Sequence, residues 1–166
     1  AKAHRPPKAH DLAAATKAVA RTAAELVPQS DVWIATLSMS GMVLEAFREL
    51  KRQGRRPRGL VAESRPKLEG RTMAAALAAE GIPVWLVSDA ALPMLVQQAA
   101  GVWLGADAVT EHGVLNKVGS FTAALAAREH GVPVHAIAIR RKLVPAATPA
   151  LSISEMGLAK KDIPQR

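Results

Sequence analysis

Residues 105–120, which read GADAVTEHGVLNKVGS, hold four chemically useful side chains in one short segment: Asp107, Asn116, Lys117 and Ser120. A carboxylate such as Asp107 can accept sugar hydroxyls or act as a general acid or base. Asn116 and Lys117 stand just before a predicted helix start at Ser120, where free N–H groups and the positive dipole end favour a phosphate. We therefore predict Asp107 as the catalytic residue if the site is active, and the other three as substrate- or phosphate-binding residues. The alternatives are a turn or cap role for Asp107, an exposed Lys117 and a helix cap at Ser120.

Two other segments contain candidates for the same site. Ser38 and Ser40 lie in TLSMSG and can hold a phosphate at the next helix start. Arg65 lies in ESRPKLEGR, and arginine binds phosphate through two parallel hydrogen bonds. A structural ion pair of Arg65 with Glu63 or Asp89 is the alternative.

Several other kinds of chemistry are not expected. There is no cysteine, which excludes disulfides, thiolate metal sites and a cysteine nucleophile. The five histidines lack metal-ligand spacing, so no metal is predicted. A serine nucleophile would need a G-x-S-x-G elbow, and none is present. Dinucleotide and Walker motifs are also missing, so no cofactor is expected.

The elements that must position these residues alternate between helix and strand. The predicted helices cover residues 11–27, 40–54, 70–81, 91–101 and 118–131, and the predicted strands cover 31–36, 59–63, 82–89, 102–107 and 132–139. Nearly continuous apolar strands alternating with helices predict an α/β fold, a mainly parallel sheet covered on both faces. We expect the strand order 3-2-1-4-5. Ligands of such sheets bind outside the carboxyl ends of the strands, where the candidate residues lie, so Asp107, Asn116, Lys117 and Arg65 should line one crevice.

Length and composition limit the organisation and the partners. The 166 residues predict a basic N-terminal arm at residues 1–10 and a single domain at residues 11–166. The net charge of +8 favours anionic partners such as phosphorylated metabolites. The basic run RELKRQGRRPR has no interleaved aromatic residue, so nucleic acid is not an expected partner. No apolar run is long enough for a membrane span and no signal peptide is evident, so we expect a cytoplasmic protein without a membrane partner.

Taken in order, the motifs resemble a known family. TLSMSGMVLEAF, VAESRP…EG, VSDAA and GADAV…G…NKVGSF are similar to segments of the alpha, beta and delta subunits of translation initiation factor 2B. The same family contains the isomerases of methylthioribose-1-phosphate and ribose-1,5-bisphosphate. The resemblance runs from about Asp11 to Val134 and indicates a short member of bacterial or archaeal type.

The resemblance implies a Rossmann-like three-layer fold, with the N-terminal helical domain of the family largely absent from this chain. It implies that Asp107 matches a catalytic aspartate of the isomerases and that Asn116 and Lys117 match residues contacting the sugar phosphate. The catalytic cysteine of the isomerases corresponds to Ser38 here, which is the pattern of the initiation-factor branch.

Three functions follow as alternatives. The first is non-catalytic binding of a phosphorylated sugar or a related metabolite, the second is an active aldose-ketose isomerase, and the third is an oligomerisation module without a small ligand. We also predict a homodimer, because the family dimerises and because Trp33, Trp103 and the Ala-rich helices offer more apolar surface than one sheet layer needs.

Overall fold

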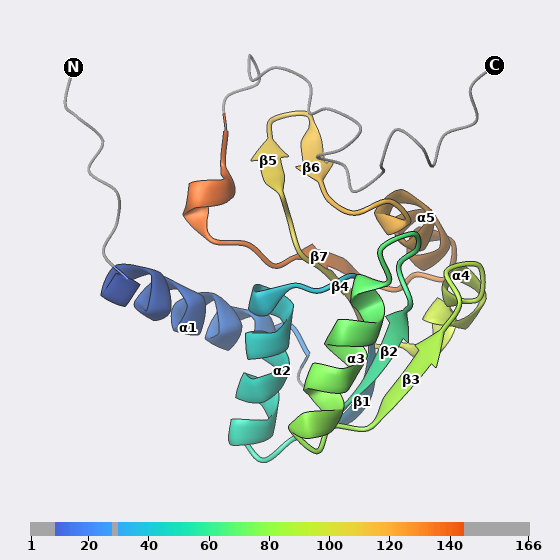
Figure 1. Cartoon of the computed structure of the whole chain (residues 1–166), viewed down its shortest axis with the longest axis horizontal. Helices are drawn as coiled ribbons and strands as arrows, with labels where there is room; N and C mark the ends of the chain where they lie inside the picture. The colour runs from blue at the N-terminus through green and yellow to red at the C-terminus, as the bar shows by residue number, and fades with distance from the viewer. Residues whose placement is uncertain (1–8, 28–29, 145–166) are drawn as a thin grey trace.

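The computed structural model describes residues 9–27 and 30–144. Helices and strands alternate along this part of the chain (Figure 1). The helices are α1 (Ala9–Glu25), α2 (Gly41–Arg52), α3 (Glu69–Ala79), α4 (Leu92–Leu95) and α5 (Ser120–Glu129), with 3₁₀ turns η1 (Val96–Gln98) and η2 (Arg140–Lys142). The strands are β1 (Asp31–Leu37), β2 (Arg56–Ala62), β3 (Val84–Val87), β4 (Gly101–Leu104), β5 (Ala108–Thr110), β6 (Gly113–Leu115) and β7 (Val134–Ala136).

Five strands form one parallel sheet in the order β3-β2-β1-β4-β7. The register pairs Asp31 at the start of β1 with Arg56 of β2, and Ile34 of β1 with Gly101 of β4. The order is the predicted 3-2-1-4-5, with β7 as the fifth parallel strand, so the predicted α/β fold is confirmed. Strand order reverses between β1 and β4, which is where open α/β sheets bind their ligands.

Helices cover both faces of this sheet and enclose two apolar cores. On one face, Phe47 of α2 and Leu77 of α3 pack in the same core as Trp103 of β4. On the other face, Ala123 of α5 packs in a core with Leu60 of β2. Figure 1 shows α2 and α3 side by side in front of the sheet, with α4 and α5 together at its right-hand side. The three layers hold the carboxyl ends of the strands at one edge.

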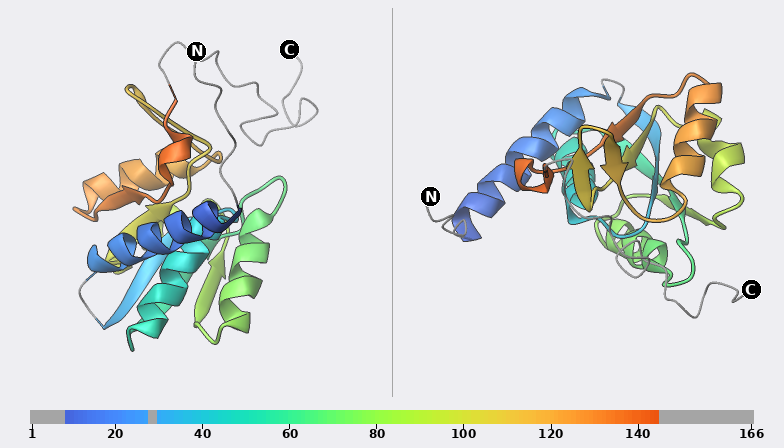
Figure 2. Two further views of the ribbon diagram at one scale, coloured as in Figure 1. Left: turned by 90° about the vertical axis from the view of Figure 1, so that its left-hand side faces the viewer. Right: turned by 90° about the horizontal axis from the view of Figure 1, so that it is seen from above.

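Two segments differ from the predicted elements. Residues 91–101 were expected as one helix, but α4 gives way to the 3₁₀ turn η1, and Ala99 is already extended, with ψ 145°, as the chain enters β4. Residues 108–115 were expected to connect a strand to a helix, but they form the antiparallel hairpin β5–β6, with Val109 opposite Val114. The hairpin projects away from the main sheet (Figures 1 and 2).

The two tryptophans that were expected to add apolar surface, Trp33 and Trp103, contribute less of it than expected. Trp103 is fully buried and meets Phe47 edge-on, with ring centroids 5.6 Å apart. Trp33 is partly covered by Trp85, whose ring centroid lies 4.7 Å away. Surface apolarity comes instead from other residues, above all Phe121 of α5, which is 75% exposed. The prediction that Trp103 provides surface for self-association is therefore wrong, because its ring completes the core.

Candidate functional site

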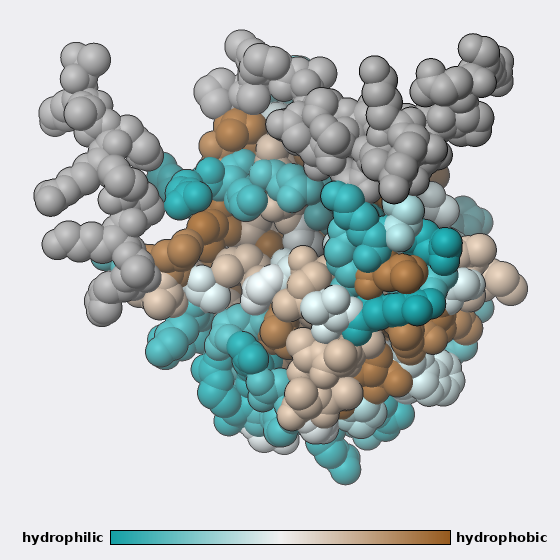
Figure 3. Space-filling view, viewed as in Figure 1, coloured by the Kyte–Doolittle hydropathy of each residue, from teal (hydrophilic) through white to brown (hydrophobic). Residues whose placement is uncertain are grey.

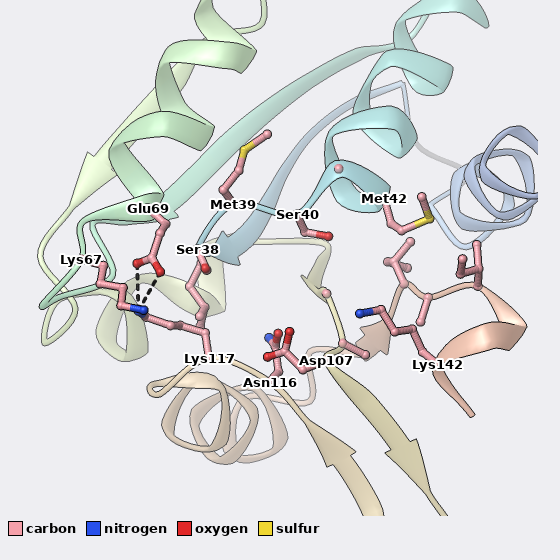
Figure 4. A pocket seen from close by; sticks show the side chains of 17 residues that line it. Ser38, Met39, Ser40, Met42, Lys67, Glu69, Asp107, Asn116, Lys117 and Lys142 are labelled. Carbon is pink, nitrogen blue, oxygen red and sulfur yellow. Dashed lines mark hydrogen bonds and ion pairs between the residues drawn. The ribbon is translucent and has the colours of Figure 1, made fainter. Parts of the chain in front are cut away.

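A pocket of about 450 Å³ opens at the carboxyl edge of the sheet, between the ends of β1 and β4. Its walls come from the segments after β1, β2, β4, β6 and β7 (Figure 4). The polar side chains among its lining residues are Ser38, Ser40, Lys67, Glu69, Asp107, Asn116, Lys117 and Lys142. Five of the seven residues that the sequence selected, Ser38, Ser40, Asp107, Asn116 and Lys117, thus line one cavity.

Ser38 is placed by a hydrogen bond that links the ends of β1 and β2. Its backbone adopts φ 61°, and its N–H donates to the hydroxyl of Ser64, 2.6 Å away. Ser64 is almost fully buried, and its hydroxyl donates in turn to the carbonyl of Ala62. The turn after β1 is therefore held to β2, and this fixes one wall of the pocket.

Ser40 and Gly105 form the contact between α2 and the end of β4. Ser40 caps α2, and its hydroxyl accepts the N–H of Val43 at 3.4 Å. A Cβ on Gly105 would stand 2.8 Å from the Ser40 hydroxyl oxygen and 2.9 Å from its Cβ. Only glycine at position 105 lets α2 begin this close to the strand. The start of α2 consequently forms the floor of the pocket.

Asp107 and Asn116 flank the hairpin on the opposite wall. The N–H of Asp107 donates to the carbonyl of Leu115 at 2.8 Å, which continues the β5–β6 pairing up to the pocket. The Asn116 amide donates to the hydroxyl of Ser120 at 2.9 Å. Figure 4 shows the Asp107 and Asn116 side chains next to each other inside the cavity. Together they offer a carboxylate and an amide to one bound group.

Three lysines surround this pair, and two of them were not predicted from the sequence. Lys67 lies beside Lys117, whereas Lys142 directs its amine into the cavity from the far side (Figure 4). Lys142 is held there because Val109 of the hairpin bridges to Leu143, and the N–H of Val144 donates to the Val109 carbonyl. The sequence predicted no helix or strand after residue 139, so it contained no signal for Lys142.

Lys117 is nearly buried and already has a partner. Its amine lies 2.8 Å and 3.0 Å from the two carboxylate oxygens of Glu69, and its side chain is 4% exposed. Glu69 is the first residue of α3. It lies within the segment ESRPKLEGR that drew attention to Arg65, but no sequence pattern showed that it would meet Lys117.

Arg65 and Ser120 do not line this pocket. Arg65 lines a second cavity, on the face of the sheet that carries α4 and α5. Its backbone N–H donates to Asp89, while the nearby Glu63 pairs with Arg71. The predicted single crevice therefore does not include Arg65, because the turn after β2 directs it to the opposite face.

Ser120 is tied into the start of α5. Its hydroxyl donates to the carbonyl of Lys117 at 2.7 Å and accepts the Asn116 amide. The helix cap is Gly119, in a left-handed conformation with φ 98°, and not Ser120 as the structural alternative proposed. Ser120 therefore orients the Asn116 side chain but does not itself line the cavity.

Neither a metal centre nor a membrane span is evident in residues 9–27 and 30–144. No group of three or more histidine and carboxylate side chains lies close enough to hold a metal ion within these ranges. None of the helices described there is long and apolar enough to cross a lipid bilayer.

These features define a three-layer α/β domain with a polar, lysine-rich pocket at the strand-order reversal of its parallel sheet. Residues 8–161 match the Initiation factor 2 subunit family. The chain belongs to this family, and the resemblance seen in the motifs is confirmed.

Individual relatives agree with this assignment. A Pyrococcus furiosus protein described as translation initiation factor eIF-2B subunit 2-like is 37% identical over 85 residues, which are 51% of this chain and 30% of that protein. The solved structure of translation initiation factor eIF-2B from Pyrococcus horikoshii OT3 is 32% identical, with a TM-score of 0.77, over 81% of this chain and 49% of that one.

More distant structures share the fold. Subunit delta of eIF-2B from A. fulgidus is 23% identical, with a TM-score of 0.76, over 88% of this chain and 48% of that one. A chain of the tetrameric eIF2B-beta2-delta2 complex from C. thermophilum is 22% identical, with a TM-score of 0.72, over 87% of this chain and 46% of that one. The present chain thus spans about half the length of these structures and less of the P. furiosus protein.

Proposed function

We propose that this chain binds a phosphorylated sugar or a related metabolite in the pocket at the carboxyl edge of the sheet, without isomerising it. The observation that carries the proposal is the gathering of Lys67, Lys117 and Lys142 around Asp107 and Asn116 in one cavity. Lysines attract a phosphate. The Asp107 carboxylate can accept hydrogen bonds from sugar hydroxyls, and the Asn116 amide can donate to them or accept from them. The cavity of about 450 Å³ has the size of a small-molecule site.

The lack of an activated nucleophile supports binding without catalysis. Ser38 stands where the isomerases of the family carry a cysteine, and among the described residues no histidine lines the pocket to activate its hydroxyl. The isomerases use the cysteine together with the aspartate to move a proton or hydride between adjacent carbons of the sugar. Asp107 lacks such a partner here. Loss of one member of such a pair lowers the rate on the order of 10³-fold or more.

A panel of phosphorylated sugars tests this function. Ribose-1,5-bisphosphate and methylthioribose-1-phosphate should each raise the melting temperature, and Asp107→Asn should weaken this shift only modestly. A coupled assay should detect no ketose product. Turnover of either compound at about 1 s⁻¹, an ordinary enzymatic rate, would favour the isomerase instead.

We further propose that the chain forms a homodimer, and one apolar surface supports this. Phe121 and Leu125 are four residues apart on one side of α5, exposed Val118 lies in the turn just before this helix, and Met94 of α4 is exposed on the neighbouring helix. We call these four residues the α5 face. Phe121 and Met94 are 75% and 72% exposed, which is unusual for such large apolar side chains.

Surface colouring and one relative agree with this proposal. Figure 3 shows hydrophobic surface gathered on the right-hand side of the molecule, where α4 and β3 lie. The C. thermophilum relative is a subunit of a tetrameric complex. If no phosphorylated sugar binds while the chain self-associates, the oligomerisation module becomes the favoured function.

A further inference from the structure

The most buried cation of the pocket is not free to hold an anion. An ammonium group has three N–H donors, and two positions around the Lys117 amine are taken by the Glu69 carboxylate, at 2.8 Å and 3.0 Å. Lys117 is 4% exposed and Glu69 31% exposed. Solvent therefore screens this ion pair much less than it screens the surface pairs of the chain.

The backbone that carries Glu69 is fixed against the end of β2. Glu69 follows Leu68, which has a left-handed backbone with φ 60°, and precedes Gly70. A Cβ on Gly70 would stand only 1.7 Å from the carbonyl oxygen of Ala62, so α3 begins in direct backbone contact with the end of β2. Glu69 is thus presented to Lys117 by a fixed helix start.

The other two lysines of the pocket differ from Lys117. Lys67 and Lys142 are exposed, and neither forms an ion pair within residues 9–27 and 30–144. Lys142 faces the cavity from the side opposite to Glu69 (Figure 4). At one end of the pocket Glu69 consequently neutralises Lys117, with Lys67 beside them, and the opposite end is cationic because of Lys142.

We propose that Glu69 is a specificity-determining residue of this pocket, and this inference rests on the proposed function. Its carboxylate occupies the place on Lys117 that a phosphate would take, so an anion at this end must displace Glu69 and then face its charge. The ion pair instead presents one remaining N–H donor and carboxylate lone pairs, which suit a sugar hydroxyl. The phosphate is held by Lys142, on the opposite side of the pocket, and Glu69 lowers the affinity of the Lys117 end for anions.

The test is calorimetric titration with ribose 5-phosphate as the probe. Glu69→Gln keeps the side-chain shape but removes the charge, which frees Lys117 to bind the phosphate. The Kd should fall about tenfold, the scale of one charge-assisted hydrogen bond. Glu63→Gln is the matched control, because Glu63 is a partly exposed carboxylate of the adjoining segment that pairs with Arg71 outside the pocket. Its Kd should stay within about twofold of the wild-type value.

The double variant Glu69→Gln/Lys117→Met shows whether the gain acts through Lys117. The tenfold gain should disappear in it. A gain that persists there, or a Glu69→Gln protein that binds no tighter than wild type, overturns the inference.

Lys117→Met and Lys142→Met provide an independent measurement if Glu69→Gln does not fold. Because Glu69 neutralises Lys117 and the phosphate lies at Lys142, Lys142→Met should weaken binding more than Lys117→Met does. A larger loss in Lys117→Met would make Lys117 the direct phosphate ligand and refute the inference. The two proposals fail differently. Binding by wild type without a gain in Glu69→Gln refutes only the role of Glu69. If neither protein binds ribose 5-phosphate, ribose-1,5-bisphosphate or methylthioribose-1-phosphate, the proposed function is refuted as well.

Discussion

Asp89 accepts a hydrogen bond from the backbone N–H of Ser64, with donor and acceptor 2.7 Å apart. Its second carboxylate oxygen accepts the N–H of Arg65 at the same distance. Since the Ser64 hydroxyl accepts the N–H of Ser38, one chain of hydrogen bonds joins the carboxyl ends of β3, β2 and β1. The shape of the pocket wall at Ser38 therefore depends on a residue that does not line the pocket.

Replacing Asp89 tests this dependence. Asp89→Ala leaves two backbone donors without their charged acceptor and should lower the free energy of unfolding by about 1–3 kcal/mol. Urea denaturation measures this change. Glu111→Ala, at the exposed tip of the hairpin, is the control and should change stability by less than about 0.5 kcal/mol. Equal losses in the two variants would contradict the proposed role of Asp89.

Gly70 should tolerate no side chain. Gly70→Ala would place its Cβ 1.7 Å from the Ala62 carbonyl oxygen, so α3 must move away from β2. We expect a loss of about 3 kcal/mol or more in the free energy of unfolding. Gly41→Ala is the matched control, because Gly41 is also helical and a Cβ added to it would meet nothing within 4 Å. It should stabilise the protein or leave it unchanged, by at most about 1 kcal/mol.

His135 of β7 should make the protein less stable in mild acid. Burial lowers the pKa of His135 below the ordinary value of 6.5, so the unfolded chain takes up this proton more readily than the folded one. The histidine has no effect well above pH 6.5, and it reduces stability as the pH falls below that value. His135→Gln should therefore lose less stability than wild type between about pH 7.5 and pH 5.5, a window around this ordinary histidine pKa.

Chemical denaturation at the two pH values measures this difference. His130→Gln is the control, because His130 is exposed at the end of α5. The free energy of unfolding of the His130→Gln variant should change between the two pH values as much as that of the wild-type protein. A wild-type slope in His135→Gln would show that other groups cause the acid sensitivity.

Self-association should depend on the α5 face. Phe121→Ser removes its most exposed apolar side chain, so light scattering should show a dimer for wild type and the 17.5 kDa chain for the variant. Leu143→Ser removes an apolar side chain that is 58% exposed but lies outside this face, and it should leave the dimer intact. A wild-type protein that is monomeric at micromolar concentration would refute the proposed dimer.

The strand order followed from the sequence because it depends on local alternation. Apolar strands and intervening helices permit few arrangements of a parallel sheet, and the predicted 3-2-1-4-5 order is the observed one. The hairpin β5–β6 escaped prediction because each strand has only three residues, too few for a periodic pattern to stand out.

The contacts within the site were harder to predict. Asp107 ends a predicted strand and Asn116 stands just before the next predicted helix, so their place at the carboxyl edge was accessible from the sequence. Glu69 and Lys117 are 48 positions apart, and only the folded backbone shows that they pair. Arg65 also follows a strand, yet it faces the other side of the sheet, because strand ends fix the edge but not the direction of the following turn.

The hairpin β5–β6 has one end at the pocket and the other in solvent, and these two ends differ in how freely their residues can be substituted. Asp107 directly precedes β5 and Asn116 directly follows β6, so both residues flank the end of the hairpin that lies at the pocket. The hydrogen bond from the Asp107 N–H to the Leu115 carbonyl closes the ladder at this end. At the other end, Glu111 and His112 are exposed to solvent. Evolution can therefore lengthen or recharge the tip while the ladder keeps the two pocket side chains in register, so new contacts with other molecules can be gained there without rebuilding the pocket.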